Sequence, residues 1–238
     1  MILQALTDYY RVLEQAGKID APGWAPVKVS YALLLSENGT LEQVIDIQTE
    51  QPRGKKMASA PQILSLPAPV KRTVGVAANF LCDNAGYLLG IDSKGKPQRT
   101  RECFEASRSL HEQLLAGVDS PAARAVAAFF RSWDPETARE HPALAEHLED
   151  ILRTLDGYVH RDPSVRRAWD AFYQAEGDGP QGICLVTGQP GPVESVHPAI
   201  KNVAGAQSSG AALVSFNAPA FCSYGKEQNL NAPTGKYA

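Results

Sequence analysis

The dipeptide Asn38-Gly39 constrains the fold of this chain more than any other short feature. It lies between the runs VKVSYALLLS (27–36) and LEQVIDIQTE (41–50), which are rich in apolar residues. Asn-Gly favours the turns whose twist matches that of two paired strands. The sequence therefore predicts a β-hairpin over residues 28–49, with a buried first strand.

Apolar residues at helical spacing dominate two other regions. Residues 2–16 predict a short helix whose apolar face packs and which ends at Gly17. Residues 102–175 contain four amphipathic segments of about 10–15 residues, and we expect their aromatic side chains to form core. Hairpin and helices together predict an α+β fold. We expect one domain over residues 1–238, with mixed β-sheet elements at its N-terminal and C-terminal ends and an inserted helical lobe at about 102–175.

The remaining segments give shorter predictions. Residues 51–73, rich in Pro, Lys and Arg, predict loop with short extended pieces. Residues 84–86 predict a turn and 87–91 a strand after it. Residues 181–188 predict a buried strand, and residues 210–217 predict a strand between two polar loops.

Composition favours a cytoplasmic protein with a sizeable core. The chain has 238 residues, 44% of them hydrophobic. Its start lacks the pattern of a signal peptide, and no apolar stretch is long enough to cross a membrane. The four cysteines are far apart and form no C-x-x-C pair, so we expect reduced thiols, no metal site and no cofactor.

Charge is segregated along the chain. Residues 51–101 hold 9 Lys and Arg against 2 Asp and Glu, whereas residues 102–180 hold 8 against 15. A basic block in a protein of net charge -3 is a candidate phosphate-binding face. The alternative is a solvated basic loop. For Asn79 and Asn84, which lie in this block, the alternative to contact with a nucleic acid is turn and cap chemistry.

The stretch from His197 to Pro233 is rich in amide side chains and contains only one acidic residue, Glu227. Small residues let a backbone approach a partner closely, and amides can read its hydrogen-bond donors and acceptors. The stretch therefore predicts a recognition surface rather than a catalytic one.

Hydrolytic chemistry has little support in the sequence. A nucleophile would have to be Cys184, Cys222 or Ser195 beside His197, but no G-x-S-x-G elbow surrounds the serines. The apolar context of Cys184 is expected to raise the pKa of its thiol. Neither an H-E-x-x-H pair nor a phosphate-binding G-x-x-x-x-G-K-[ST] loop is present, and we expect no enzymatic activity.

Two stretches together resemble the large subunit of the type I-C CRISPR surveillance complex (Cascade), a bacterial RNA-guided DNA-binding assembly. They are KRTVGVAANFLCDNAGYLLG (71–90) and CLVTGQPGPVESVHPAIKNVAGAQSSGAALVSFNAPAFCSYGKEQNLNAP (184–233), with MILQALTDYY at the start as a third. Proteins of that family are much larger, so the resemblance implies the N-terminal part only.

The resemblance implies a role in antiviral defence. The subunit would recognise the protospacer-adjacent motif of double-stranded target DNA and help to open the duplex, while the guide RNA reads the target. Its implied partners are the guide ribonucleoprotein, other Cascade subunits and a helicase-nuclease recruited after binding. A DNA-mimicking anti-CRISPR protein would favour the same basic face. The residues expected to contact nucleic acid are Lys71, Arg72, Asn79, Asn84, Lys201, Asn202, Gln207, Ser208, Ser209 and Lys226.

A different class of function stays open beside this one. The same loops could dock the subunit onto neighbouring Cascade proteins and onto the 5′ handle of the guide RNA, leaving DNA to other parts of the assembly.

Overall fold

The computed structural model describes residues 2–54, 56–70, 72, 75–92, 94–144, 155–156, 158–175, 180–194, 196–197, 200, 204–205, 210–211, 214–216 and 218–235. The chain divides into two compact units. The central unit is Gly23–Tyr173, and the terminal unit combines Met1–Pro22 with Gln174–Ala238. With about 38% helix and 23% strand, the α+β prediction is confirmed. The expectation of one domain stays a prediction.

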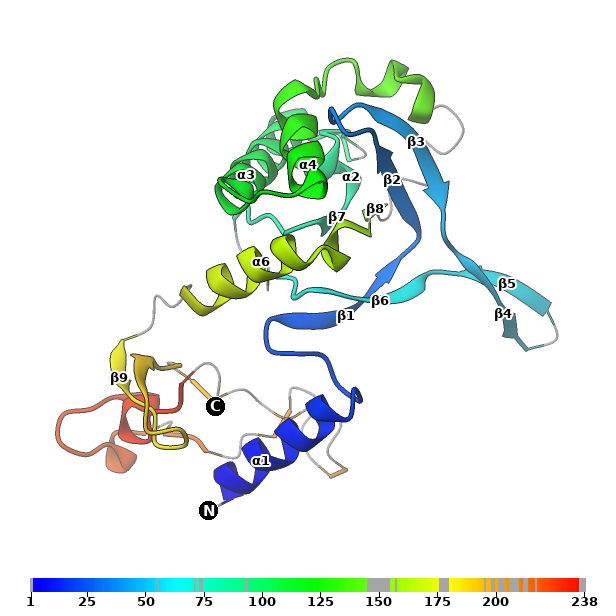
Figure 1. Cartoon of the computed structure of the whole chain (residues 1–238). Helices are drawn as coiled ribbons and strands as arrows, with labels where there is room; N and C mark the ends of the chain where they lie inside the picture. Colours follow the sequence, from blue (N-terminus) through cyan, green and yellow to red (C-terminus); the bar gives the residue numbers. More distant parts are fainter. Residues whose placement is uncertain are drawn as a thin grey trace. The chain divides into compact units, whose positions relative to one another are not determined.

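Six consecutive strands open the central unit (Figure 1). They form three antiparallel pairs: β1 (Trp24–Val29) with β6 (Gln62–Pro67), β2 (Tyr31–Leu35) with β3 (Leu41–Asp46), and β4 (Thr49–Arg53) with β5 (Lys56–Ala60). The predicted hairpin is confirmed as β2–β3.

The predicted strand over residues 27–36 is instead two strands, because the chain changes its partner at Ser30. The carbonyl oxygen of Ser30 accepts a hydrogen bond from Ile47 N at 3.0 Å, between the β1–β6 pair and the β2–β3 pair. Val29 and Tyr31 on either side are both buried. The sequence hides this break because YALLL (31–35) is apolar at every position, whereas the structure leaves Leu34 42% exposed.

Gly39 is required at the hairpin turn by its conformation and by its neighbours. Its φ is +84°, in the left-handed region that glycine adopts without strain. A Cβ atom there would lie 2.4 Å from the backbone nitrogen of Phe129 and 2.6 Å from Ala128 Cβ. The turn therefore packs directly against helix α4 (Pro121–Ser132).

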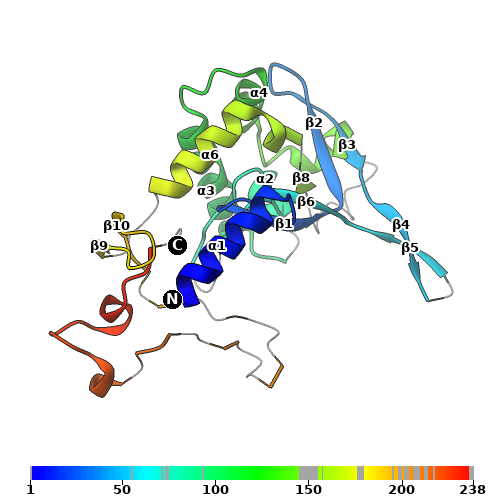
Figure 2. The ribbon, with the colours of Figure 1, turned by 60° about the horizontal axis from the view of Figure 1, so that its bottom comes forward.

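The short extended pieces predicted over residues 51–73 are strands β4, β5 and β6, which leave less loop than expected because they occupy most of this stretch. All five residues of β4 are exposed, so its sequence carries no apolar alternation. The β4–β5 pair extends away from the rest of the central unit in both Figure 1 and Figure 2. We call this pair the β4–β5 arm.

The predicted turn at 84–86 and strand at 87–91 are also wrong. Asn84 is the N-cap of the short helix α2 (Ala85–Leu88), and its Oδ1 accepts a hydrogen bond from Gly86 N at 3.0 Å. Tyr87 and Leu88 are buried. A short apolar run that is buried all round does not distinguish helix from strand by periodicity.

Helices form most of the rest of the central unit, as predicted, but Leu155, which was expected on a helical face, lies in a short strand. The helices are α3 (Pro97–Leu115), α4 and α6 (Pro163–Ala175), with 3-10 turns at Ala138–Glu140, Pro142–Leu144 and Tyr158–Arg161. β7 (Cys82–Asp83) pairs with β8 (Leu155–Asp156). The predicted third helical segment falls largely on residues 145–154, outside the described residues.

The aromatic side chains of these helices are core, as predicted. Phe129, Phe130, Trp133 and Trp169 are all buried. Trp133 Nε1 donates to Leu89 O at 3.0 Å, so the indole has a partner inside the core. Ser120 caps α4 by accepting from Ala123 N at 3.0 Å, with Pro121 at the first helical position.

The terminal unit begins with α1 (Ile2–Gln15), and Gly17 follows it with φ +65°. The helix is confirmed, but its apolar face is not packed as predicted: Leu6 is 43%, Tyr9 60% and Val12 59% exposed. No helix among the described residues is long and apolar enough to cross a membrane.

The later strands of the terminal unit are shorter than predicted. β9 (Gln181–Ile183) pairs with β10 (Pro190–Pro192), and two of the three residues of β9 are exposed, so the predicted buried strand over 181–188 is wrong. Within the predicted strand at 210–217, Ala211 forms a single bridge with Ile200, and residues 212–213 and 217 lie outside the described residues. Two 3-10 turns, Pro219–Phe221 and Gln228–Asn231, follow.

Candidate nucleic-acid interface

The buried carboxylate of Asp83 organises the loop that precedes α2. Its side chain is 2% exposed. Oδ1 accepts hydrogen bonds from Arg72 Nη1 and from Asn84 N, each at 2.9 Å. Oδ2 accepts from Asn79 N at 3.0 Å and also forms an ion pair with Arg72 Nη2. A buried charge is tolerated only when it is paired and hydrogen-bonded, so these contacts fix the loop around Asp83.

Arg72, predicted to contact nucleic acid, is engaged inside the protein. Besides the two contacts to Asp83, its Nε donates to Ala77 O at 2.6 Å, and its guanidinium lies 4.0 Å from the centroid of the Tyr87 ring. Burial works against the charged form, but the hydrogen bonds and charge of Asp83 outweigh it and raise the pKa of Arg72. Three of the five guanidinium N–H donors are thus used to hold the loop.

Asn79 and Asn84 both have structural partners for their side-chain oxygens. Asn79 Oδ1 accepts from Val70 N at 3.0 Å. Asn84 Oδ1 caps α2, and its Nδ2 donates to Asp83 Oδ1 at 3.2 Å. Turn and cap chemistry is therefore what the structure shows for these amides. Contact with a base or phosphate by either residue stays a prediction.

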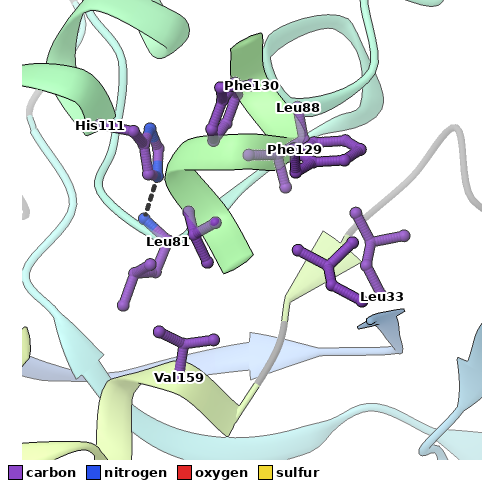
Figure 3. A pocket seen from close by; sticks show the side chains of 9 residues that line it. Leu33, Leu81, Leu88, His111, Phe129, Phe130 and Val159 are labelled. Carbon is purple, nitrogen blue, oxygen red and sulfur yellow. Dashed lines mark hydrogen bonds between the residues drawn. The ribbon is translucent and has the colours of Figure 1, made fainter. Parts of the chain in front are cut away.

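His111 supports the same loop through Leu81 and was not singled out by the sequence (Figure 3). Its Nε2 accepts a hydrogen bond from Leu81 N at 2.9 Å, and its Nδ1 lies 2.7 Å from Ser107 O, the geometry of a donated hydrogen bond. Leu81 has φ +63°, uncommon for a bulky residue. The hydrogen bond accepted from Leu81 N requires a neutral ring, and burial lowers the pKa of His111 to about 4 although the contact with Ser107 O favours the charged form.

The cavity beside His111 is too small to be a ligand pocket. Its volume is about 50 Å³, and apolar side chains such as Leu33, Leu81 and Phe130 line it (Figure 3). Ligand pockets usually measure roughly 300–1,000 Å³. This space belongs to the core.

A basic cluster forms where the loop meets the start of α3. Arg99 Nη2 donates to Gly75 O at 2.7 Å and so joins the loop to the first turn of the helix. Lys94, Lys96 and Arg99 are exposed, and we call these three residues the basic cluster. The first turn of α3 holds no acidic residue and Lys96 provides no side-chain cap. The partial positive charge of the helix N-terminus therefore adds to the three cations.

A larger groove on the other side of α3 has no such excess of positive charge. Its volume is about 610 Å³, and it contains four arginines and four carboxylates: Arg101, Arg108, Arg131, Arg139, Asp92, Glu105, Asp134 and Glu136. Arg101 pairs with Glu136, and Arg108 pairs with Glu105 at 3.0 Å. A groove whose charges balance has no net attraction for a polyanion.

Most of the predicted recognition residues lie outside the described residues. These are Lys71, Lys201, Asn202, Gln207, Ser208 and Ser209. Lys226 is described and exposed, beside a tight turn. Their contact with nucleic acid stays a prediction.

The turn before Lys226 presents an aromatic side chain to solvent. Tyr224 and Gly225 have φ of +54° and +68°, and Lys226 N donates to Ser223 O at 3.0 Å, the pattern of a type I′ turn. Asn231 holds the turn, since its Oδ1 accepts from Ser223 N at 2.7 Å and its Nδ2 donates to Lys226 O at 2.9 Å. Tyr224 is 97% exposed.

The pKa of the Cys184 thiol is shifted in the direction opposite to the one predicted from the sequence. Burial raises the pKa of its thiol, but hydrogen bonds from Thr187 and from backbone N–H groups outweigh it, so that the pKa is lowered rather than raised. Sγ lies 3.4 Å from the backbone nitrogens of Val186 and Thr187 in a tight turn, and Cys184 is buried. Within the part of the chain that the structure describes, no group of three His, Cys, Asp or Glu side chains could hold a metal ion.

The comparison with protein families gives the class of protein. Residues 6–238 match the family described as "CRISPR-associated protein (Cas_Csd1)", which covers nearly the whole chain. The chain is thus a CRISPR-associated protein and belongs to the Cas_Csd1 family. No curated protein matches it.

Proposed function

We propose that this chain is a non-catalytic DNA-binding part of the large subunit of a type I-C Cascade. In this role it recognises the protospacer-adjacent motif of double-stranded DNA in the cytoplasm and helps to open the duplex. Membership of a CRISPR-associated family supports a role inside a Cas complex. RNA-guided complexes delegate the reading of the target to the guide and leave the short motif to the protein.

The basic cluster is the observation that carries the proposal. Lys94, Lys96 and Arg99 are exposed at the start of a 19-residue helix. Contacts of Lys and Arg side chains with phosphates supply the sequence-independent part of DNA affinity and position the protein on the duplex. The side chains predicted to contact base edges, such as Gln207 and Asn202, would add the sequence-dependent part of the DNA affinity.

The environment of Cys184 supports the non-catalytic part of the proposal. Its sulfur accepts backbone hydrogen bonds within its own turn, and the residue is 4% exposed. A thiolate nucleophile needs access to its substrate as well as a lowered pKa.

Gel shifts of the assembled complex with its guide RNA test the proposal. The duplexes carry the same target and differ only in the flanking motif. We expect Lys94→Ala with Lys96→Ala to weaken all duplexes alike and to reduce the salt slope by about one for each lost phosphate contact. Lys18→Ala with Lys28→Ala removes two other exposed lysines and should change neither.

Substitution of a residue predicted to contact base edges should change discrimination between motifs rather than overall affinity. Gln207→Ala should lose about 1–3 kcal/mol of discrimination between correct and wrong motifs. If the wild-type complex binds all flanking sequences equally, motif recognition is excluded. If the lysine variants and their control behave alike, the basic cluster does not contact the DNA.

Docking to other subunits is a second candidate function, and helix α1 favours it. Its side chains Leu6, Tyr9 and Val12 are 43%, 60% and 59% exposed, an apolar face of the kind that marks protein interaction sites. The same experiment separates the two functions, since a docking role predicts that Tyr9→Glu blocks assembly of the complex while the lysine variants leave DNA binding unchanged.

A further inference from the structure

The β4–β5 arm contributes almost nothing to the core of the central unit. All residues of β4 are exposed, and so is Met57 of β5, at 60%. The two strands pair with each other from Thr49↔Ala60 to Arg53↔Lys56, and no third described strand joins them. An isolated two-stranded hairpin is marginally stable in water, so burial of apolar surface does not explain this arm.

The tip of the arm carries a charge arrangement that weakens the hairpin itself. Arg53 and Lys56 are directly opposite each other in the register, and the tip sequence Arg53-Gly54-Lys55-Lys56 adds a third cation. Like charges at opposed positions destabilise a strand pair. Neither Arg53 nor Lys56 forms an ion pair with a described residue. Glu50 is the one acidic residue in 49–60.

An anionic partner would remove this repulsion. The shape of the arm also selects among polyanions, because a two-stranded β-ribbon fits the major groove of double-helical DNA, where its sides meet phosphates of both strands. A Cβ atom at Gly54 would have no neighbour within 4 Å, so the tip is open to a close approach.

We propose that the β4–β5 arm binds the phosphates that border a groove of double-stranded DNA, with Arg53 and Lys56 as its contacts. This inference rests on the proposed DNA-binding function and adds a second contact surface beside the basic cluster. The arm binds without reading sequence, because its tip offers cations and no amide side chain.

Charge reversal at Arg53 gives a test that keeps the hairpin folded. Arg53→Glu places a carboxylate opposite Lys56 and so converts a repulsive pair into an attractive one. The matched control is Lys28→Glu, an equal charge change at an exposed position of β1. Both variants are assembled into the complex with guide RNA, and binding to fluorescein-labelled duplex is titrated over a range of salt concentrations.

We expect Arg53→Glu to weaken binding to matched and mismatched flanking motifs by the same factor and to lower the salt slope by about one or more. Lys28→Glu should leave both unchanged. If Arg53→Glu matches the wild type in affinity and slope, the arm proposal fails while the proposed function stands.

Two other outcomes are informative. If Arg53→Glu prevents assembly with the guide ribonucleoprotein, the arm binds RNA or protein, and the proposal is overturned. If the wild-type complex itself shows no salt-dependent binding to duplex DNA, the proposed function fails, and the arm proposal fails with it.

Discussion

Acid should destabilise the central unit through His111. The pKa of this histidine is about 4 in the folded chain and about 6.5 when unfolded. The unfolded state therefore binds the proton more readily, so the stabilising effect of the neutral ring is complete above pH 6.5. It is lost as the pH falls from 6.5 toward 4. The slope is about 1.4 kcal/mol per pH unit, and the total is about 3 kcal/mol.

The contacts of the ring explain this penalty. A protonated His111 could no longer accept the hydrogen bond from Leu81 N, and its charge would lie in an apolar core between the rings of Phe80 and Phe130. The N–H of Leu81 would then be buried without an acceptor, in a backbone conformation that already carries strain.

Urea unfolding followed by tryptophan fluorescence measures the effect. All three tryptophans, Trp24, Trp133 and Trp169, belong to the central unit, so the signal reports on the unit that contains His111. His111→Gln retains an acceptor for Leu81 N but does not titrate. The free energy of unfolding of the wild type minus that of the variant should fall with decreasing pH between 6.5 and 4. A flat difference over that range would refute the reasoning.

Two further predictions concern stability. Arg72→Ala should lower the free energy of unfolding of the central unit by about 3–5 kcal/mol, because it leaves the carboxylate of Asp83 buried without its ion pair. Urea titrations measure this loss, and a loss below about 1 kcal/mol would contradict the pairing. Replacing both residues by Leu should cost less free energy of unfolding than the sum of the two single changes. Tyr224→Asn should raise the free energy of unfolding of the terminal unit by about 1 kcal/mol, because Asn-Gly suits the type I′ turn better than a tyrosine at φ +54°. Thermal unfolding by circular dichroism checks this, with the exposed Tyr9→Asn on α1 as a control that should not stabilise the chain.

Local features of the fold followed from the sequence. The hairpin at Asn38-Gly39, helix α1 and the Ser120-Pro121 helix start depend on backbone preferences and on neighbours within a few residues. The aromatic core of the helical lobe followed from spacing alone. The resemblance of the sequence to a known family also predicted a CRISPR-associated protein, and the match to the family model supports this coarser identification.

Tertiary partners decided the rest. Residues 87–91 carry an apolar run that suits helix and strand equally, and contacts from distant residues, such as Trp133 Nε1 with Leu89 O and the Arg72 guanidinium with the Tyr87 ring, hold it in its folded conformation. Nothing in the sequence around Arg72 reveals that Asp83, 11 residues later, takes up its charge. The sequence could place a basic block at 51–101, but only the folded chain separates cations that hold a loop, such as Arg72, from those exposed in the basic cluster and on the β4–β5 arm. Whether a cation is free to bind depends on the distance to the nearest carboxylate, and folding sets that distance.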